Sequence, residues 1–212
     1  MEFPDSTILI FAKAPIEGQV KTRLIPEYGA GFATNLHANM VQHCIKTAVC
    51  SNLCPVELWC APHANNKHFK NWQTQFNIDL QQQVGANLGE RMANAFKAVL
   101  LRSRNVIIIG TDCPMLSNST LYKALCVLQA NKDAVLTPAE DGGYALIGLK
   151  DSYESLFDNI PWGTENVLAK TREQLEKLKL ECVETEVHWD VDRPADVRRL
   201  NELPSLRYLL ET

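Results

Sequence analysis

The run from Val106 to Ile109 consists of four consecutive β-branched residues between Asn105 and Gly110. A run of this kind is apolar on both faces, which is typical of a strand that helices cover on both sides, as in a parallel sheet. It therefore predicts the buried central strand of an α/β sheet.

Short apolar runs and amphipathic helical patterns alternate on both sides of this strand. The sequence predicts further strands at 7–12, 56–60, 76–80, 134–138, 144–149 and 182–189, and helices at 30–49, 66–72, 88–101, 116–130, 164–178 and 194–200. A hairpin signal, Glu140-Asp141-Gly142-Gly143, separates two of the strands. The alternation predicts an α/β fold with three α/β/α layers around a mainly parallel mixed sheet. No linker or internal repeat interrupts it, so we predict a single domain over residues 1–212.

Charge and hydropathy exclude several classes of function. The formal net charge is -4 without a basic run, which argues against a nucleic-acid partner. No apolar stretch reaches the roughly 18 residues of a membrane span, and the seven irregularly spaced cysteines indicate reduced thiols, so we expect a cytoplasmic protein. The sequence leaves open whether a last helix, 204–210, lies on the sheet or forms the contact of a homodimer.

Three basic residues occupy the loop that follows the first predicted strand. In KAPIEGQVKTRL they are Lys13, Lys21 and Arg23, around a single Gly18. Ligands of open α/β sheets bind beyond the carboxyl ends of the strands, where a loop with these cations could clamp a polyphosphate. The alternative is a solvated basic loop. The GxxxxGK signature of a P-loop is absent.

Carboxylates follow two other strands. Asp112 comes directly after the central strand, where it could hold Mg²⁺ or Mn²⁺ on nucleotide phosphates, or could only bond backbone amides of its turn. Asp190 and Asp192 follow the last strand, and the sequence leaves open which of them reaches the metal. For Asp192 the alternative is the N-cap of the helix that Pro194 begins.

Two further segments are weaker candidates. Asn87, before the helix at 88–101, could contact a base or phosphate, or could simply cap that helix. In the hairpin turn, Asp141, Gly142, Gly143 and Tyr144 could form the acceptor side of the site, where glycine permits the close approach of a ligand.

These segments, taken in order, resemble one bacterial family. They are FAKAPIEGQVKTRL, GANLGERM, GTDCPML, DGGYALIGL, the segment Trp162-Gly163-Thr164, and DVDRPADVRRL. The family is that of GT-A-like radical-SAM/selenodomain-associated transferases, in the nucleotide-diphospho-sugar transferase superfamily, and the resemblance extends from about Ile8 to Leu200. The first loop is also similar to that of phospholactate and molybdenum-cofactor guanylyltransferases. This chain has Asn87 where the family usually has Asp, and Arg193 where it commonly has Thr.

The resemblance implies a Rossmann-like GT-A fold, Mg²⁺ or Mn²⁺ as cofactor, and a nucleotide or nucleotide sugar with a small-molecule acceptor as partners. It implies that Lys21 and Arg23 clamp phosphates, that Asp112 binds metal and nucleotide, and that Asp192 is the second metal ligand. We therefore predict a metal-dependent transferase in which Lys21, Arg23 and Asp112 are catalytic and Lys13 and Asn87 add nucleotide contacts. Nucleotidyl transfer from a nucleoside triphosphate is the leading prediction; the alternatives are glycosyl transfer from a nucleotide sugar and a non-catalytic nucleotide-binding module.

Overall fold

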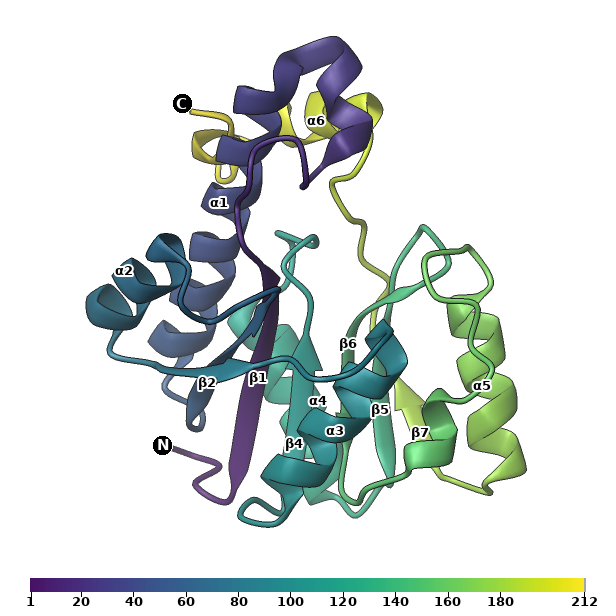
Figure 1. The fold of residues 1–212 in the computed structure, drawn as a ribbon. Helices are drawn as coiled ribbons and strands as arrows, with labels where there is room; N and C mark the ends of the chain where they lie inside the picture. Colours follow the sequence, from purple (N-terminus) through teal and green to yellow (C-terminus); the bar gives the residue numbers. More distant parts are fainter. Residues whose placement is uncertain (212) are drawn as a thin grey trace.

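The computed structural model describes residues 1–211, which form one seven-stranded mixed sheet between layers of helices (Figure 1). The strands are β1 (Ser6–Lys13), β2 (Val56–Ala61), β3 (Asp79–Gln82), β4 (Asn105–Ile109), β5 (Ala134–Pro138), β6 (Tyr144–Leu149) and β7 (Cys182–Glu184). Their order is β3-β2-β1-β4-β6-β5-β7, and only β6 runs antiparallel to its neighbours. The predicted three-layer α/β fold with a mainly parallel sheet is confirmed.

The two faces of the sheet carry separate apolar clusters. One face is covered by α1 (Ile25–Ser51), α2 (Lys67–Phe76) and α4 (Asn118–Gln129), and the other by α3 (Leu88–Leu100), the 3-10 helix η2 (Glu154–Phe157) and α5 (Val167–Lys177). All five residues of β4 are buried, because helices lie on both of its sides. This confirms the central strand that the β-branched run predicts.

The order of the strands creates a switch point between β1 and β4. From β1 the chain continues to β2 and β3 on one side, and then crosses back so that β4 pairs with the other side of β1. The loops that leave β1 and β4 therefore diverge at the same edge of the sheet, which is where open α/β sheets bind their ligands.

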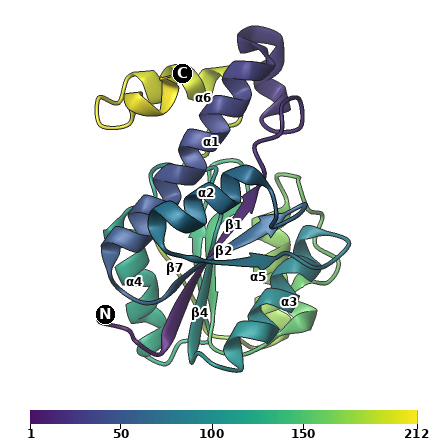
Figure 2. The same cartoon turned by 60° about the vertical axis from the view of Figure 1, so that its left-hand side comes forward.

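A third apolar cluster stands above this edge (Figures 1 and 2). It joins the first half of α1, the short helix η1 (Thr22–Leu24), α6 (Pro194–Asn201) and η3 (Arg207–Leu210). Leu206 and Leu209 are buried there, against α1 rather than against the sheet. Of the two expectations for residues 204–210, contact with the sheet is therefore wrong, and these two leucines are not free to contact a second copy.

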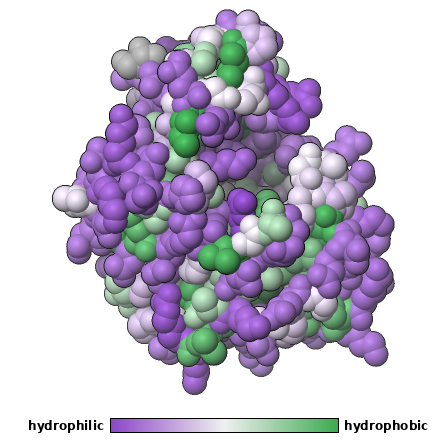
Figure 3. Space-filling view, in the orientation of Figure 1, coloured by the Kyte–Doolittle hydropathy of each residue, from purple (hydrophilic) through white to green (hydrophobic). Residues whose placement is uncertain are grey.

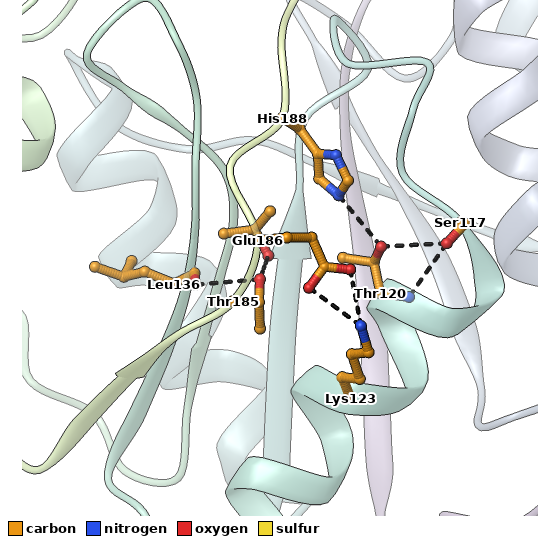
Figure 4. A network of polar contacts seen from close by, with 8 residues as sticks. Ser117, Thr120, Lys123, Leu136, Thr185, Glu186 and His188 are labelled. Atoms are coloured by element: carbon orange, nitrogen blue, oxygen red, sulfur yellow. Dashed lines mark hydrogen bonds and ion pairs between the residues drawn. The ribbon is translucent and has the colours of Figure 1, made fainter.

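The segment 185–193 connects β7 to α6 and crosses the carboxyl edge of the sheet. Its beginning is held by β5, where Thr185 N and His188 N donate to the carbonyls of Leu136 and Pro138 at 2.9 Å each. Side chains tie it to α4, as Figure 4 shows: Lys123 pairs with Glu186 at 3.1 Å, and His188 lies 3.3 Å from the Thr120 hydroxyl. We call this segment the crossing segment.

Several predicted bounds differ from the structure. The strand predicted at 76–80 is β3 at Asp79–Gln82, because α2 continues to Phe76 and Asn77 ends it in a left-handed conformation. The strand predicted at 182–189 pairs over three residues only, since the chain then leaves the edge of the sheet as the crossing segment. The first helix begins five residues earlier than predicted, at Ile25, and is kinked at Gly29. The single-domain prediction stays a prediction.

Candidate functional site

The loop after β1 returns to the sheet through an ion pair in which the lysine is buried and the aspartate is exposed. Lys21 Nζ lies 2.6 Å from Asp112 Oδ1; the Lys21 side chain is only 3% exposed, whereas that of Asp112 is 58% exposed. Partial burial alone would raise the pKa of Asp112, but the charge and hydrogen bond of Lys21 outweigh it and lower that pKa. Two residues that the sequence separates by 91 positions thus meet at the switch point.

The loop that carries Asp112 is fixed by elements on either side of it. Val191 N, in the crossing segment, donates to the Asp112 carbonyl at 2.9 Å. From α1, His43 Nε2 donates to the Pro114 carbonyl at 3.0 Å, and the Cys44 thiol lies 3.6 Å from the Gly110 carbonyl. The bond from Val191 holds the backbone between Asp190 and Asp192 against the loop of Asp112, and the shared site stays a prediction.

Asp192 forms the second ion pair of the site, with Arg23. The alternative interpretation, in which Asp192 caps α6, is wrong. Asp196 Oδ2 accepts the backbone N–H groups of Asp192 and Arg193, at 3.0 and 2.7 Å, and satisfies the start of that helix. The Asp192 carboxylate therefore makes its ion pair with Arg23 rather than a cap for α6.

Asp190 lies in a more buried and more acidic environment. Burial raises its pKa to about 6, and the charges of Asp141 and Asp112 contribute. Neighbouring Glu140 is different, because Arg199 holds it with two hydrogen bonds, at 2.7 and 3.2 Å, and lowers its pKa. Carboxylates from two other segments, Asp112 and Asp141, thus act on Asp190 at this edge.

Lys13 ends β1 with its side chain exposed, and its carbonyl oxygen is held by a buried histidine. His37 Nε2 donates to that oxygen at 2.9 Å, and the residue is 4% exposed. His37 is not among the predicted site residues, because one histidine among the apolar positions of α1 resembles a core residue. Its only signal in the sequence is a polar side chain on the otherwise apolar buried face of that helix.

Asn87 caps α3 in the way that the structural alternative describes. Its Oδ1 accepts Glu90 N and its Nδ2 donates to Glu90 Oε1, both at 2.9 Å. The preceding loop is also tied to this helix, since Arg91 Nε donates to the Gly85 carbonyl at 3.0 Å. With both of its polar atoms in use, Asn87 shapes the loop, and a contact from Asn87 to a nucleotide stays a prediction.

The turn between β5 and β6 confirms the hairpin prediction, and it is closed by Asp141 Oδ1, which accepts Gly143 N at 2.9 Å. Gly142 has φ +86°, and a Cβ there would lie 2.0 Å from the Glu165 carbonyl oxygen. The close approach at this glycine is therefore made by the backbone of residue 165. The Tyr144 hydroxyl is buried, and burial raises its pKa. Of the four acceptor-side candidates, Asp141 has an exposed polar side chain.

The loop at 161–166 links this turn to α3. A Cβ at Gly89 would lie 2.6 Å from Nε1 of Trp162, so the indole lies directly on the first turn of α3. Leu168 N donates to the Gly142 carbonyl at 2.8 Å on the other side. The segments around Gly89, Gly142 and Trp162, which carry the family resemblance, thus contact one another in a continuous chain.

The acidic groups fit a divalent metal only in part. Carboxylate oxygens are the ligands that Mg²⁺ and Mn²⁺ prefer, and the Asp112 side chain, which contacts Lys21 through Oδ1, is 58% exposed. Within residues 1–211, however, no three His, Cys, Asp or Glu side chains gather closely enough to hold a metal ion. The donor set suits a metal that takes its remaining ligands from phosphates and water, as Mg²⁺ usually does in nucleotide sites.

Figure 3 shows the surface hollowed between the third apolar cluster and the edge of the sheet, with hydrophilic residues and some hydrophobic ones around the hollow. Five polar residues that the sequence predicts for one site lie at this edge of the sheet in the fold: Lys21, Arg23, Asp112, Asp190 and Asp192. In residues 1–211, no helix is both long and apolar enough to cross a membrane.

Comparison with known proteins identifies the family. The family model described as "Uncharacterized protein conserved in bacteria (DUF2064)" matches residues 44–164. A crystal structure from Desulfovibrio desulfuricans G20, provisionally assigned as a nucleotide-diphospho-sugar transferase, is 32% identical, with a TM-score of 0.85 over 97% of this chain and 91% of that one. The chain belongs to the DUF2064 family. No curated protein matches its sequence.

More distant structures share the fold of this DUF2064 protein. CMP:2-keto-3-deoxy-manno-octonic acid synthetase, solved with CTP, is 10% identical with a TM-score of 0.62, over 96% of this chain and 99% of that one. Glucosyl-3-phosphoglycerate synthase from Mycobacterium tuberculosis, solved with Mn²⁺ and UDP, is 10% identical with a TM-score of 0.54, over 93% and 75%. At these identities the likeness concerns the fold alone, and the fold is that of nucleotide-diphospho-sugar transferases and cytidylyltransferases.

Proposed function

We propose that this DUF2064 protein is a metal-dependent transferase that acts on a nucleotide-activated substrate, and that it transfers a nucleotidyl group from a nucleoside triphosphate to a small acceptor. The observation that carries the proposal is the pairing of Lys21 with Asp112 and of Arg23 with Asp192 at the switch point. Cations suited to phosphates and carboxylates suited to a metal thus face each other where the fold binds ligands.

The roles follow from the chemistry of the side chains. Arg23 offers a planar fork to phosphate oxygens, and Lys21 offers a compact charge, so both would hold the triphosphate and stabilise the pyrophosphate as it leaves. Asp112 and Asp192 would hold Mg²⁺ or Mn²⁺, which when bound offsets negative charge on the phosphates. Catalysis of this type depends on positioning and electrostatics, and it needs no protein nucleophile.

Glycosyl transfer from a nucleotide sugar is the second candidate, because one carboxylate remains exposed on the acceptor side. That reaction requires a base for the acceptor hydroxyl. Glu140 is held by Arg199, whereas Asp141 keeps an exposed carboxylate on the turn after β5 and would be that base. A non-catalytic module would bind nucleotide without turnover.

Thermal-shift measurements test the proposal. The purified protein is screened against nucleoside triphosphates and nucleotide sugars, with and without Mg²⁺ or Mn²⁺. A ligand that binds only the folded state raises the free energy of unfolding, by about 2.7 kcal/mol when its concentration is a hundred times Kd. The melting temperature rises accordingly. We expect a metal-dependent shift with triphosphates that disappears in Asp112→Ala.

The matched control is Asp79→Ala, which removes an exposed carboxylate at the start of β3, away from the switch point. It should keep the full shift. A shift with nucleotide sugars but not with triphosphates would move the assignment to glycosyl transfer. No shift with any nucleotide would refute the nucleotide site itself.

A further inference from the structure

An open cavity of about 480 Å³ lies at the amino edge of the sheet, where β1 and β4 begin. Ser6 and Asn105, the first residues of these strands, line it, as do Leu100 and Leu128 near the ends of α3 and α4. An adjoining cavity of about 390 Å³ shares part of this lining. In Figure 1 the two strands begin at the bottom, away from the third apolar cluster. The residues assigned to the proposed function lie at the other end of these strands.

The apolar part of the lining comes from both faces of the sheet. Phe3 and Leu128 belong to the cluster beneath α1, α2 and α4, and Leu100 packs against the cluster beneath α3 and α5. The cavity therefore opens where the two layers of helices end. Its volume is within the roughly 300–1,000 Å³ that is usual for small-molecule sites. An aromatic ring or a short alkyl chain would find apolar contacts on either side of it.

Hydrogen bonds between the two strand starts fix the polar part of the lining. Asn105 Nδ2 donates to the Ser6 hydroxyl at 3.2 Å, and both side chains are buried. Arg104 N donates to the Asp5 carbonyl at 2.7 Å. A lining that is already held in place does not have to be ordered when a ligand binds, so less of the binding free energy is lost.

The charged residues of the lining carry a net positive charge. Arg104 and Lys150 line the larger cavity, and Asp5 is the one carboxylate among the described residues around it. Within residues 1–211, neither cation forms an ion pair. Lys150 donates to Asn131 Oδ1, which is a neutral partner. Two cations without a carboxylate partner thus line one cavity of a protein whose net charge is -4, and such a concentration of one sign favours a ligand of the other.

We propose that this cavity is a second binding site, and that it takes a small organic anion. Arg104 and Lys150 hold the carboxylate or phosphate group of that ligand, and its ring or short chain contacts the apolar part of the lining. The eight residues of β1 rise about 3.3 Å each, so roughly 23 Å separate this cavity from the carboxyl edge of the sheet. A ligand at that distance takes no part in the proposed reaction, and it is an effector rather than a substrate.

Benzoate, phenyl phosphate and benzylamine are the test ligands, because each carries one phenyl ring and they differ in charge. Binding is measured and located from the backbone amide signals of the isotope-labelled protein in NMR titrations. We expect benzoate or phenyl phosphate to shift the signals of residues 103–105 and 150, with a Kd of about 1 mM or lower, as is usual for ligands with so few atoms. The tighter of the two anions identifies the acidic group. Benzylamine should bind about tenfold or more weakly, since the two cations repel it.

Arg104→Glu is the decisive variant, because it reverses the charge of an exposed side chain. It should bind the anions about tenfold or more weakly and should prefer benzylamine to benzoate, a reversal that unfolding does not produce. Lys150→Gln removes the second cation and should also weaken the anions; it gives the test if Arg104→Glu does not fold. The control is Arg198→Glu, which reverses the charge of an exposed arginine on α6, beyond the carboxyl edge. It should bind all three ligands as the wild type does.

Shifts confined to residues 13, 21 and 23 would place the anions on the basic loop after β1 and would overturn the proposal. Equal binding of the three ligands, unchanged binding in both variants, or no binding at all would also overturn it. Arg104 and Lys150 would then only offset the negative ends of α3 and α4. None of these results affects the proposed function, which the thermal shifts with nucleotides test separately.

Discussion

Replacing Gly142 by alanine is expected to destabilise the protein more than the same replacement at Gly163. Both glycines have a positive φ, +86° and +81°, so alanine suffers backbone strain of about 1 kcal/mol at either position. They differ in what the new methyl group meets. At Gly142 it would lie 2.0 Å from the Glu165 carbonyl oxygen, whereas at Gly163 nothing lies within 4 Å.

The magnitude follows from that contact. The backbone at Glu165 would have to move by more than 1 Å, and overpacking of this severity costs about 1–3 kcal/mol beyond the strain. In a chain of 212 residues, each kcal/mol lowers the melting temperature by roughly 2–4 °C. Gly163→Ala should therefore lose about 2–4 °C, and Gly142→Ala a further 2 °C or more.

Differential scanning calorimetry of the two variants and the wild type measures these shifts under one buffer condition. Equal losses would refute the reasoning, because they would mean that the turn after β5 does not lie against the loop at 161–166. A larger loss at Gly163 would point to a contact at that position which the structure lacks.

The remaining predictions concern stability elsewhere in the fold. Burial lowers the pKa of His37, the charges of Lys21 and Lys13 lower it further, and Asp112 opposes them, so the unfolded chain binds the proton more readily than the folded protein. The free energy of unfolding should therefore fall as the pH decreases below 6.5, by up to about 1.4 kcal/mol per pH unit. Urea titrations at about pH 7.5 and 5.5 should show a smaller fall for His37→Gln than for the wild type. Leu209→Ala should cost about 2–5 kcal/mol in urea unfolding, because this fully buried leucine joins the end of the chain to α1, and a loss below 1 kcal/mol would contradict that burial. Arg199→Ala removes an exposed ion pair with Glu140 and a contact 4.3 Å from the Trp189 ring centroid, so its cost should stay near 1 kcal/mol, and high salt should reduce the difference from the wild type.

The layered fold could be predicted from the sequence because local signals agreed with the tertiary structure. The run from Val106 to Ile109 is apolar on both faces, and its burial required only helices on either side. The predictions failed where tertiary contacts determine the path of the chain. Residues 185–189 alternate like a strand, yet after Glu184 the chain leaves the edge of β5 and crosses the sheet, and no local pattern encodes that departure.

In the candidate site, too, local signals predict some positions, and tertiary contacts determine the others. The position of Asp112 after the central strand could be read from the sequence, because the end of a buried strand has a fixed place in such folds. Its partner could not, since the contact with Lys21 depends on the path of the loop at 14–21 and on the left-handed conformation of Lys21 itself. His37 was missed for a related reason: its role is visible only once the Lys13 carbonyl is known to lie above α1.

The crossing segment has a consequence for how the protein is made. Residues 189–209 supply Asp190 and Asp192 and complete the cluster that supports the first half of α1. Synthesis therefore has to continue past residue 192, well beyond the last strand, before these two carboxylates can join Asp112. A product that ended after β7 would retain all seven strands and both sheet-covering layers, yet it would lack Asp190 and Asp192.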